Sequence, residues 1–442
     1  MSKKDTKTPQ NPNTPLQFNY VPYPLWRRHV PLPLRPLKLL ATRYLSRHYP
    51  VAEDRTPPKD PRRMARYLDH FRLMSSHSVD ELSRLIEESE ARIEDATSIA
   101  LEATGTSSVQ EKNNHLPIRL PAQWETNQGI LLNWPILYPP LWELHAQMTE
   151  AIAPVAEAVI TIPAPMWAHA AWIYLRQRGK LSDDSLKNVR FLVLPTDDIW
   201  VRDYGPTIGL DSAGKRVVVD AIYDPLPFYP QARDDSMPLR FAAHEGFLSV
   251  DLALHHEGGN LWTDGAGMLI MTDHLFYTNP YYDRARMETL LHSTFAYDKL
   301  IITPHMAIEQ TGHVDLVAKL TDAQTVLVSA PCELTSAGRL RAVRDLFRHE
   351  TNAHGQRYNV IELPTPPLYF NFWYPIRRSY TNALTVNGRV LVPTYGIEWD
   401  DEALKIYAEA MPNHEIIPID CKAGANGGGA VHCMTKEIPA GK

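Results

Sequence analysis

A recurring spacing of polar motifs most constrains the fold of this chain. The positions Asp203, Glu257, His313, Asn382 and Cys433 are separated by 54, 56, 69 and 51 residues. Steps of this size divide the chain from residue 116 to its C-terminus into five modules, each of which supplies one motif. Side chains from well-separated modules converge most simply when the modules are arranged around an axis.

Short apolar segments bounded by turn residues predict the strands of these modules. They lie at 191–195, 216–222, 268–272, 299–303, 325–330, 389–393 and 415–419. Helical patterns separate several of them, as at 141–160 and 337–349. This alternation predicts an α/β fold, or an α+β fold with much β structure.

Charge is spread unevenly between the two ends of the chain. Residues 1–72 contain 15 Lys and Arg against 5 Asp and Glu, whereas the whole chain has a net charge of −6. The remainder is therefore strongly acidic. An acidic body attracts small cationic substrates through long-range electrostatic steering.

The basic N-terminus is expected to be an extension of the body. Residues 1–61 are rich in proline, which disfavours helix and central strand, so we expect an extended arm that wraps its own body or a sister subunit of a homodimer. Binding to nucleic acid is the disfavoured alternative, because only charge supports it. Ser78 and Glu81 form a capping-box pattern that predicts an amphipathic helix over 78–103. We therefore divide the chain into an extension, 1–115, and a body, 116–442.

Three cysteines are far fewer than a disulfide framework needs. No run of eighteen apolar residues is present, and no apolar segment of a secretory signal follows Met1. These features indicate a protein of the reducing cytoplasm that does not cross the membrane.

Cys433 is the candidate nucleophile. It follows Gly427-Gly428-Gly429 and stands beside His432, and the glycines indicate close backbone approach or unusual φ angles rather than core packing. A buried cysteine is otherwise usually an inert small hydrophobe. Cys332 and Cys421 are interpreted in that second way, as structural residues.

Three acidic motifs lie upstream of this thiol. His313 and Asp315 are two residues apart, so on a strand they would project to the same face. Asp197, Asp198 and Asp203 flank Trp200 in an expected loop, where an indole among carboxylates indicates packing and suits a cation with an alkyl tail. The segment 257–260, Glu-Gly-Gly-Asn, predicts a bulge or tight turn beside a site.

Other chemistries fit these residues less well. The glycine run is not followed by the Lys and Ser/Thr of a phosphate-binding loop. The chain has no HExxH and no CxxC pair, so we expect neither zinc nor another metal or organic cofactor. A cysteine, a histidine and several carboxylates suit a thiolate that attacks a positively charged carbon, such as that of a guanidinium.

Taken together, the motifs resemble the agmatine deiminase and bacterial-type peptidyl-arginine deiminase family of guanidine-modifying enzymes. The resemblance covers roughly residues 116–442, and its segments follow the family's order. They are Leu120–Glu125 with Asn133-Trp134-Pro135, Asp198–Thr207, Glu257–Asn260 with Thr263-Asp264-Gly265, Gly312–Asp315, Ser379–Asn382 with Val392-Pro393, and Gly427–Gly429 with His432–Thr435.

The resemblance implies a fold and a set of roles. The fold is a five-module α/β propeller, the pentein fold, with pseudo-fivefold symmetry and the site on its axis. Cys433 would be the nucleophile, His313 the general acid and base, and Asp203 and Asp315 the pair that holds the guanidinium. Glu257 would support the histidine and the substrate. The remaining substrate-binding positions would be Trp200, Asp198, Asn382 and Gly428.

The resemblance further implies a hydrolase that converts a guanidino compound to its ureido form and ammonia. Agmatine, giving N-carbamoylputrescine, is the expected substrate, and free or peptidyl arginine is the alternative. Peptidyl-arginine enzymes of this type place arginines after the first acidic motif, whereas residues 223–228 contain none. Agmatine enzymes in turn tend to have glutamines after the cysteine, where this chain has Met434-Thr435-Lys436-Glu437. An amidinotransferase, a non-catalytic guanidine-binding protein and a scaffold with secondary activity remain as further alternatives.

Overall fold

The computed structural model describes residues 78–99, 115–136, 141–223, 231–309, 311–332, 334–371 and 374–442. The predicted basic arm at 1–61 and most of the arginine-free segment at 223–228 lie outside these ranges. No helix within them is long and apolar enough to cross a lipid bilayer.

The largest sheet of the described residues combines strands from both ends of the chain. Its order is β1-β4-β3-β2-β19, where β19 is antiparallel to β2 and the other pairs are parallel. The strands are β1 (Ile93–Asp95), β2 (Asn127–Asn133), β3 (Glu157–Ile162), β4 (Val189–Val193) and β19 (Thr435–Pro439). The helices that connect β2, β3 and β4 are α5 (Trp142–Ile152), α6 (Pro165–Arg178) and α7 (Asp183–Lys187).

Four three-stranded sheets repeat one pattern, in which the first two strands are antiparallel and the second and third are parallel. Their strands are β5 (Thr207–Leu210), β6 (Arg216–Ile222) and β7 (Leu248–His255); β8 (Trp262–Thr263), β9 (Met268–Thr272) and β10 (Lys299–Thr303); β11 (Ala318–Leu320), β12 (Thr325–Ser329) and β13 (Asn359–Leu363); and β16 (Leu384–Val386), β17 (Arg389–Thr394) and β18 (Glu415–Asp420). Within the largest sheet, β19, β2 and β3 follow the same pattern.

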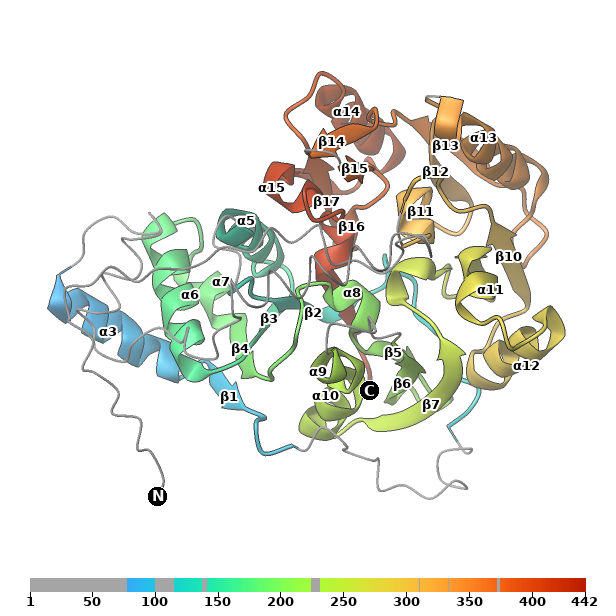
Figure 1. Ribbon diagram of the computed structural model, residues 1–442. Helices are drawn as coiled ribbons and strands as arrows, with labels where there is room; N and C mark the ends of the chain where they lie inside the picture. Colours follow the sequence, from blue (N-terminus) through green and yellow to red (C-terminus); the bar gives the residue numbers. More distant parts are fainter. Residues whose placement is uncertain are drawn as a thin grey trace, which may run out of the picture.

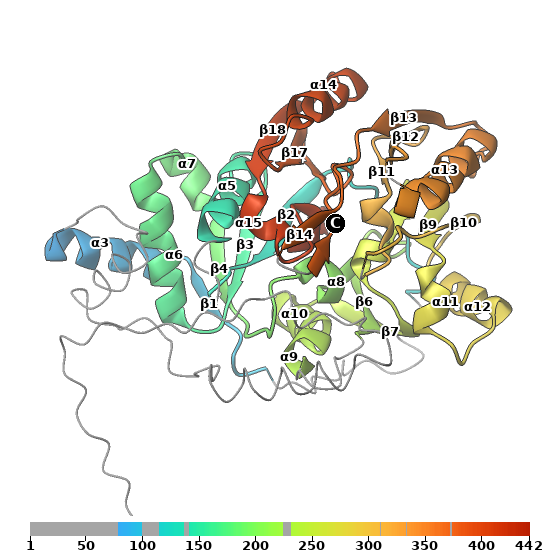
Figure 2. The same ribbon diagram turned by 45° about the horizontal axis from the view of Figure 1, so that its top comes forward.

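Helices lie between the second and third strands of each repeat, because parallel neighbours need a crossover connection. They are α9 (Ala232–Asp235), α10 (Met237–Glu245), α11 (His274–Thr278), α12 (Arg284–Thr294), α13 (Leu334–His349) and α14 (Asp400–Ala410). In Figures 1 and 2, α12, α13 and α14 lie toward the outside of the molecule, and the short helix α8 (Val201–Tyr204) lies near its middle. The hairpin β14 (Tyr369–Asn371) and β15 (Tyr374–Ile376) and the helix α15 (Lys422–Ala425) complete the regular elements.

All seven predicted strands are present, and the mixed α/β class is confirmed. The helical interpretation of 141–160 is wrong in its second half, because α5 ends at Ile152 and β3 begins at Glu157. Residues 158–162 are all buried, and periodicity alone does not distinguish such an apolar run from a buried helix.

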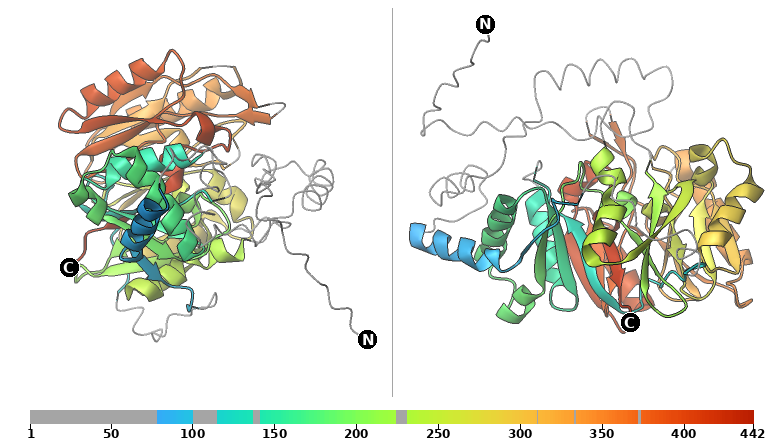
Figure 3. Two further views of the ribbon diagram at one scale, coloured as in Figure 1. Left: turned by 90° about the vertical axis from the view of Figure 1, so that its left-hand side faces the viewer. Right: turned by 90° about the horizontal axis from the view of Figure 1, so that it is seen from below.

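The helix predicted at 78–103 is shorter in the structure. Helix α3 (Val79–Glu90) begins as expected, with the Ser78 hydroxyl accepting a hydrogen bond from the backbone N–H of Glu81 at 3.1 Å. It ends before β1, which pairs with the edge of β4. Tertiary pairing therefore overrides the helical pattern after Glu90. Figure 3 shows α3 at one end of the molecule, beside α6.

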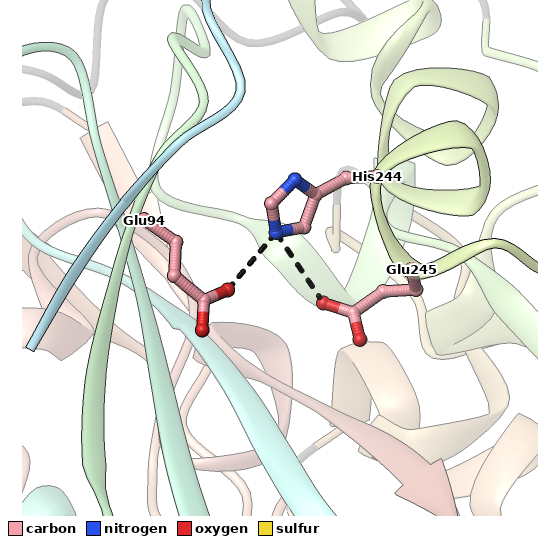
Figure 4. A group of neighbouring side chains, drawn as sticks. All are labelled: Glu94, His244 and Glu245. Carbon is pink, nitrogen blue, oxygen red and sulfur yellow. Dashed lines mark hydrogen bonds and ion pairs between the residues drawn. The ribbon is translucent and has the colours of Figure 1, made fainter.

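Ion pairs attach β1 to the body. The Arg190 guanidinium lies 2.7 Å from Glu94 and 2.8 Å from Glu245, and His244 Nε2 lies 3.0 Å from Glu94. Figure 4 shows His244 between the two carboxylates. The two carboxylates and the imidazole are close enough together to bind a metal ion. Arg190, however, already donates hydrogen bonds to both carboxylates, so the cluster is explained as an ion-pair network.

Candidate active site

The five motif segments occupy equivalent places in the fold. Each ends just before the first strand of a repeat: α8 before β5, η4 (Gly258–Asn260) before β8, η5 (Val314–Leu316) before β11, residues 379–382 before β16, and η6 (His432–Met434) before β19. Helix α8 packs against η4 and η6, and η4 packs against η5. The repeat of the fold therefore explains the spacing of the motifs in the sequence.

Cys433 is buried in η6, with 2% of its surface exposed. The Asn382 side-chain amide lies 3.2 Å from its sulfur and donates to it, and the Cys433 backbone N–H donates to Asn382 Oδ1 at 3.3 Å. The sulfur also lies 4.0 Å from Asp315 Oδ2. A donor aimed at the sulfur stabilises the thiolate, which is the nucleophilic form.

His313 lies between two carboxylates. Its Nε2 is 2.8 Å from Glu257 Oε2, and its Nδ1 is 3.5 Å from Asp203 Oδ1. Both His313 and Asp203 are buried, whereas Glu257 is half-buried. An imidazole held by a carboxylate in this way has a fixed orientation and is suited to proton transfer.

Asp315 is fully buried, and burial raises the pKa of its carboxyl to about 7. The positive charges of His313 and Arg202 oppose this shift, while the carboxylate of Asp203 adds to it. Asp315, which lies beside Cys433, thus interacts electrostatically with both His313 and Asp203, so the four residues belong to one site. Asp315 Oδ1 has no hydrogen-bond partner among the described residues.

His313 and Asp315 do not lie on a strand, contrary to the expectation. His313 is the residue before η5, and Asp315 lies within this single 3-10 turn. Their side chains therefore reach different partners, Glu257 and His432, rather than standing on one face of a sheet. Glu257 likewise precedes a 3-10 turn, η4, which confirms the tight turn predicted for its glycine pair.

Two glycines are required by close approach. A Cβ on Gly259 would lie 2.3 Å from His313 Nδ1, and one on Gly429 would lie 2.1 Å from the Trp200 ring. Trp200 itself is 1% exposed, which confirms that it packs. The glycine motifs therefore make room for the site's own side chains.

The remaining candidates have different surroundings. Gly428 is half-buried with φ +85°, a conformation that glycine adopts readily. Asp198 is half-buried, and its carboxylate accepts from the backbone N–H of Ile199 at 2.7 Å. Of the two cysteines interpreted as structural, Cys421 is buried, whereas Cys332 is exposed. It lies past the end of β12, beyond Pro331.

Sequence reasoning missed a buried layer of charged residues beside the site. The Arg202 guanidinium makes two hydrogen bonds of 2.7 Å to Glu437, and Lys436 Nζ donates to the backbone oxygen of Arg202. Lys319 donates to the side-chain oxygen of Gln123 and to the backbone oxygen of Ala383. Arg202 lies within the motif 198–207, and the only signal of Lys319, Lys436 and Glu437 in the sequence is charge inside short strands next to the motifs.

The donor atoms of Asp203, Glu257 and His313 lie within 4.8 Å of one another, a distance at which a metal could bind. The same arrangement is that of an imidazole oriented by carboxylates for proton transfer. A metal-dependent reaction would be lost on chelation, whereas proton transfer by the His313 imidazole would not.

Solved structures share this fold. Agmatine deiminase of Enterococcus faecalis matches with a TM-score of 0.65 and 20% sequence identity over 76% of this chain and 98% of that chain. C. jejuni agmatine deiminase matches with a TM-score of 0.64 and 19% identity over 73% of this chain and 97% of the other. The fold is thus the mixed α/β fold of deiminases.

The chain belongs to the Porphyromonas-type peptidyl-arginine deiminase family, whose model matches residues 119–439. This confirms the resemblance inferred from the motifs. A curated relative, agmatine deiminase of Pseudomonas fluorescens, is 28% identical over an alignment of 357 residues, gaps included, which covers 73% of this chain and 95% of the relative. Helix α3 and strand β1 precede the matched family region.

Proposed function

We propose that this protein is a guanidine iminohydrolase that converts agmatine to N-carbamoylputrescine and ammonia. Cys433 supports this most directly, because its sulfur lies 4.0 Å from an oxygen of Asp315 in a buried site that also contains His313 and Asp203. The reaction hydrolyses a C–N bond of a linear amidine, as the names of the relatives indicate for those proteins.

In the proposed mechanism, Asp203 and Asp315 accept the N–H groups of the guanidinium and hold its carbon beside the sulfur. The Cys433 thiolate adds to that carbon and forms a tetrahedral intermediate. His313 then protonates one nitrogen, the C–N bond breaks, and ammonia leaves an amidine bound to sulfur. His313 next takes a proton from water, which adds to the same carbon. Collapse expels the thiolate and releases the ureido product.

The cavity beside this site favours a substrate without a carboxylate. It is lined by Glu257 and His313 together with Ile222, His255, His256, Asn260, His274, Leu275 and Thr278. Among these described residues no Lys or Arg is available to pair with the α-carboxylate of arginine. Burial lowers the pKa of His256 to about 3, so that imidazole is neutral. Agmatine is therefore favoured over free arginine or an arginine peptide.

The repeated strand pattern supports a finer architecture. The five units that begin with β19, β5, β8, β11 and β16 would form a propeller with pseudo-fivefold symmetry around the site. Residues 116–442 would be the catalytic domain, and residues 1–115 an extension that joins two copies in a cytoplasmic homodimer. Light scattering of the full chain and of a variant lacking residues 1–77 tests that assignment.

The direct test is to incubate the purified protein with agmatine and measure ammonia and N-carbamoylputrescine. Equal amounts of both products are expected without any added amine. Product formation only in the presence of an amine acceptor, without ammonia, would indicate an amidinotransferase. Binding without either product would indicate a guanidine-binding protein, and faster turnover of arginine or arginine peptides would reassign the substrate.

The same assay tests the expectation that no metal takes part. After exhaustive chelation, turnover is expected to remain within twofold of the untreated protein, because His313 and water suffice for both proton transfers. Loss of activity that Zn²⁺ or Mn²⁺ restores would instead assign Asp203, Glu257 and His313 to a metal site.

A further inference from the structure

His432, the residue before the proposed nucleophile, contacts the same carboxylate as the thiol. Its Nδ1 lies 2.7 Å from Asp315 Oδ2, the oxygen that is 4.0 Å from the Cys433 sulfur. His432 is 1% exposed and Asp315 is fully buried. The contact therefore lies inside the site, away from solvent.

Packing fixes the orientation of the His432 ring. The ring stacks on Trp262, with 4.8 Å between centroids and 25° between planes, and the Trp262 indole N–H donates to the backbone oxygen of Ala318 at 2.8 Å. The Lys319 ammonium lies 4.8 Å from the centre of the Trp262 ring. The His432 backbone is held as well, since its oxygen accepts from Arg202 and its N–H donates to the backbone oxygen of Asn382.

The surrounding charges determine the protonation state of this ring. Burial lowers the pKa of His432 well below its usual value, and nearby cationic side chains lower it further: Arg202, Lys319, Lys436 and His313. The imidazole is therefore neutral and has one N–H. Its Nε2 has no hydrogen-bond partner among the described residues. A buried N–H without an acceptor is costly, so the hydrogen belongs on Nδ1, where Asp315 accepts it.

We propose that His432 is a positioning residue that holds Asp315 through Oδ2 and leaves Oδ1 for an N–H group of the guanidinium. This inference rests on the proposed function, because it assigns Asp315 to the substrate clamp. Oδ1 is the oxygen that has no partner among the described residues. The hydrogen bond also stabilises the ionised carboxylate that a cationic substrate needs.

The ionisation of Asp315 depends on several groups that face it. The positive charges of His313, Arg202, Lys319 and Lys436 favour the ionised form, whereas burial and the acidic side chains of Asp203 and Glu309 disfavour it. The neutral His432 ring also favours the ionised form of Asp315, because it donates a hydrogen bond to the carboxylate. Removing that donor should leave more of Asp315 protonated at neutral pH, and so weaken the clamp without removing any atom that touches the substrate.

Two variants at this position test the proposal. His432→Leu removes the donor at similar volume, and His432→Asn places an amide N–H near the position of Nδ1. At pH 7, His432→Leu is expected to lower kcat/KM for agmatine about 10- to 100-fold, as for the loss of a hydrogen bond to a charged group. The acid limb of its pH profile should move upward by roughly one to two units, because one pH unit corresponds to tenfold in the ionised fraction.

His432→Asn should recover most of this loss and return the acid limb toward that of the unmodified protein. A purely structural role predicts lower stability with an unchanged acid limb in His432→Leu. That result, or an Asn variant no better than the Leu variant, would overturn the proposal.

A binding measurement separates this inference from the proposed reaction. In a Cys433→Ala background, calorimetry with guanidinium and with agmatine should show weaker binding in His432→Leu below neutral pH, and restored binding in His432→Asn. This readout needs no turnover, so an inactive protein that still shows the difference would contradict only the proposed reaction. If the Leu variant does not fold, nitrogen-15 NMR of histidine in the unmodified protein decides. A neutral His432 with its hydrogen on Nδ1 is expected, and hydrogen on Nε2 would overturn the inference.

Discussion

At the residue scale, the site buries opposite charges in separate layers. The Asp315 carboxylate lies near the Cys433 sulfur and the Asp203 carboxylate near the His313 ring, while Arg202, Lys319 and Lys436 are buried close by, with Arg202 paired to Glu437. Burial, with the charge of Arg202, lowers the pKa of Lys436 to about 7, and burial lowers that of Lys319 to about 7. Positive charge on these side chains limits the repulsion between the Asp203 and Asp315 carboxylates, as a cationic substrate would also do.

The raised pKa of Asp315 predicts an acid limb in the pH profile. Burial raises this pKa to about 7, so below that pH the carboxyl is increasingly protonated and no longer attracts a guanidinium. We therefore expect kcat/KM for agmatine to fall about tenfold per pH unit below about pH 7. The protein's thermal unfolding at each pH serves as the control for stability. A flat profile from pH 5 to 7 would contradict the assignment.

Glu257 orients His313 and supports its proton transfers. Glu257→Gln keeps the size of the side chain but removes its charge and allows the wrong imidazole tautomer, so we expect kcat to fall about 10²- to 10⁴-fold. Steady-state kinetics with agmatine checks this. Glu88→Gln, in partly exposed pairs with Arg84 and Arg176 at the surface, is the matched control and should leave kcat unchanged. Equal activity of Glu257→Gln and the unmodified protein would remove Glu257 from the mechanism.

Much of the site at this scale could be predicted from the sequence, but not all of it. Cys433, His313, Asp203, Asp315, Glu257 and Asn382 were identified from motifs, and the structure gathers them. Lys319 and Lys436 were not assigned roles, because a lone charge in a short strand usually faces solvent. His432 was not assigned a role either, because the sequence does not show that its ring reaches Asp315. Only the tertiary structure shows that these side chains are buried and that each has a hydrogen-bond partner: Asp315 for His432, Gln123 for Lys319, and the backbone oxygen of Arg202 for Lys436.

At the element scale, one-turn helices rather than strands present the reactive groups. The seven strands predicted from the sequence are all present, because each is a short apolar run between turns, but β2, β3 and β7 were not predicted. The sequence also did not predict η5, where His313 and Asp315 were expected on a strand, since a single turn has no periodicity. Nor did it predict the end of α3 at Glu90, which depends on the pairing of β1 with β4.

The packing of the glycine run against Trp200 predicts a sharp difference between two alanine substitutions. Gly429→Ala would place a Cβ 2.1 Å from the Trp200 ring, so the loop or the indole must move, and Cys433 four residues later moves with it. We expect a loss of about 1–3 kcal/mol in stability, as for other overpacked buried sites, and at least tenfold lower kcat/KM.

Gly338→Ala is the matched control for that substitution. This glycine lies within α13, and a Cβ there would meet nothing within 4 Å. Alanine should stabilise the helix by roughly 0.5–1 kcal/mol and leave activity unchanged. Urea unfolding and steady-state kinetics of both variants check the pair, and similar behaviour of the two would contradict the packing account.

At the scale of the whole molecule, the C-terminal strand closes the fold. Strand β19 pairs with β2 near the start of the body, and Arg202 reaches from α8 to Glu437 on β19. Although burial alone would raise it, the charge of Arg202 lowers the pKa of Glu437 to about 2. The strand that follows Cys433 is thereby tied to the segment that contains Asp203.

Breaking this buried pair on one side should be costly. Glu437→Met leaves the Arg202 guanidinium buried without its carboxylate, and we expect the free energy of unfolding to fall by about 3–5 kcal/mol. The double variant Arg202→Met with Glu437→Met should lose less, because no unpaired charge remains. Urea unfolding measures both. For comparison, Glu88→Gln weakens the partly exposed pairs with Arg84 and Arg176 and should cost about 0–1 kcal/mol. A double variant less stable than Glu437→Met would show that the unpaired Arg202 guanidinium is not the cause of the loss.

The covalent role of Cys433 is the central claim, and rapid-quench mass spectrometry of the intact protein tests it most directly. During turnover of agmatine, a fraction of the chains should gain the mass of the substrate minus ammonia, with the added mass on the peptide that contains Cys433. The adduct should disappear when substrate is exhausted and should be absent from Cys433→Ala, which is also expected to lose at least about 10⁴-fold in kcat. Turnover by Cys433→Ala, or an adduct on Cys332 or Cys421 instead, would contradict the covalent role of Cys433.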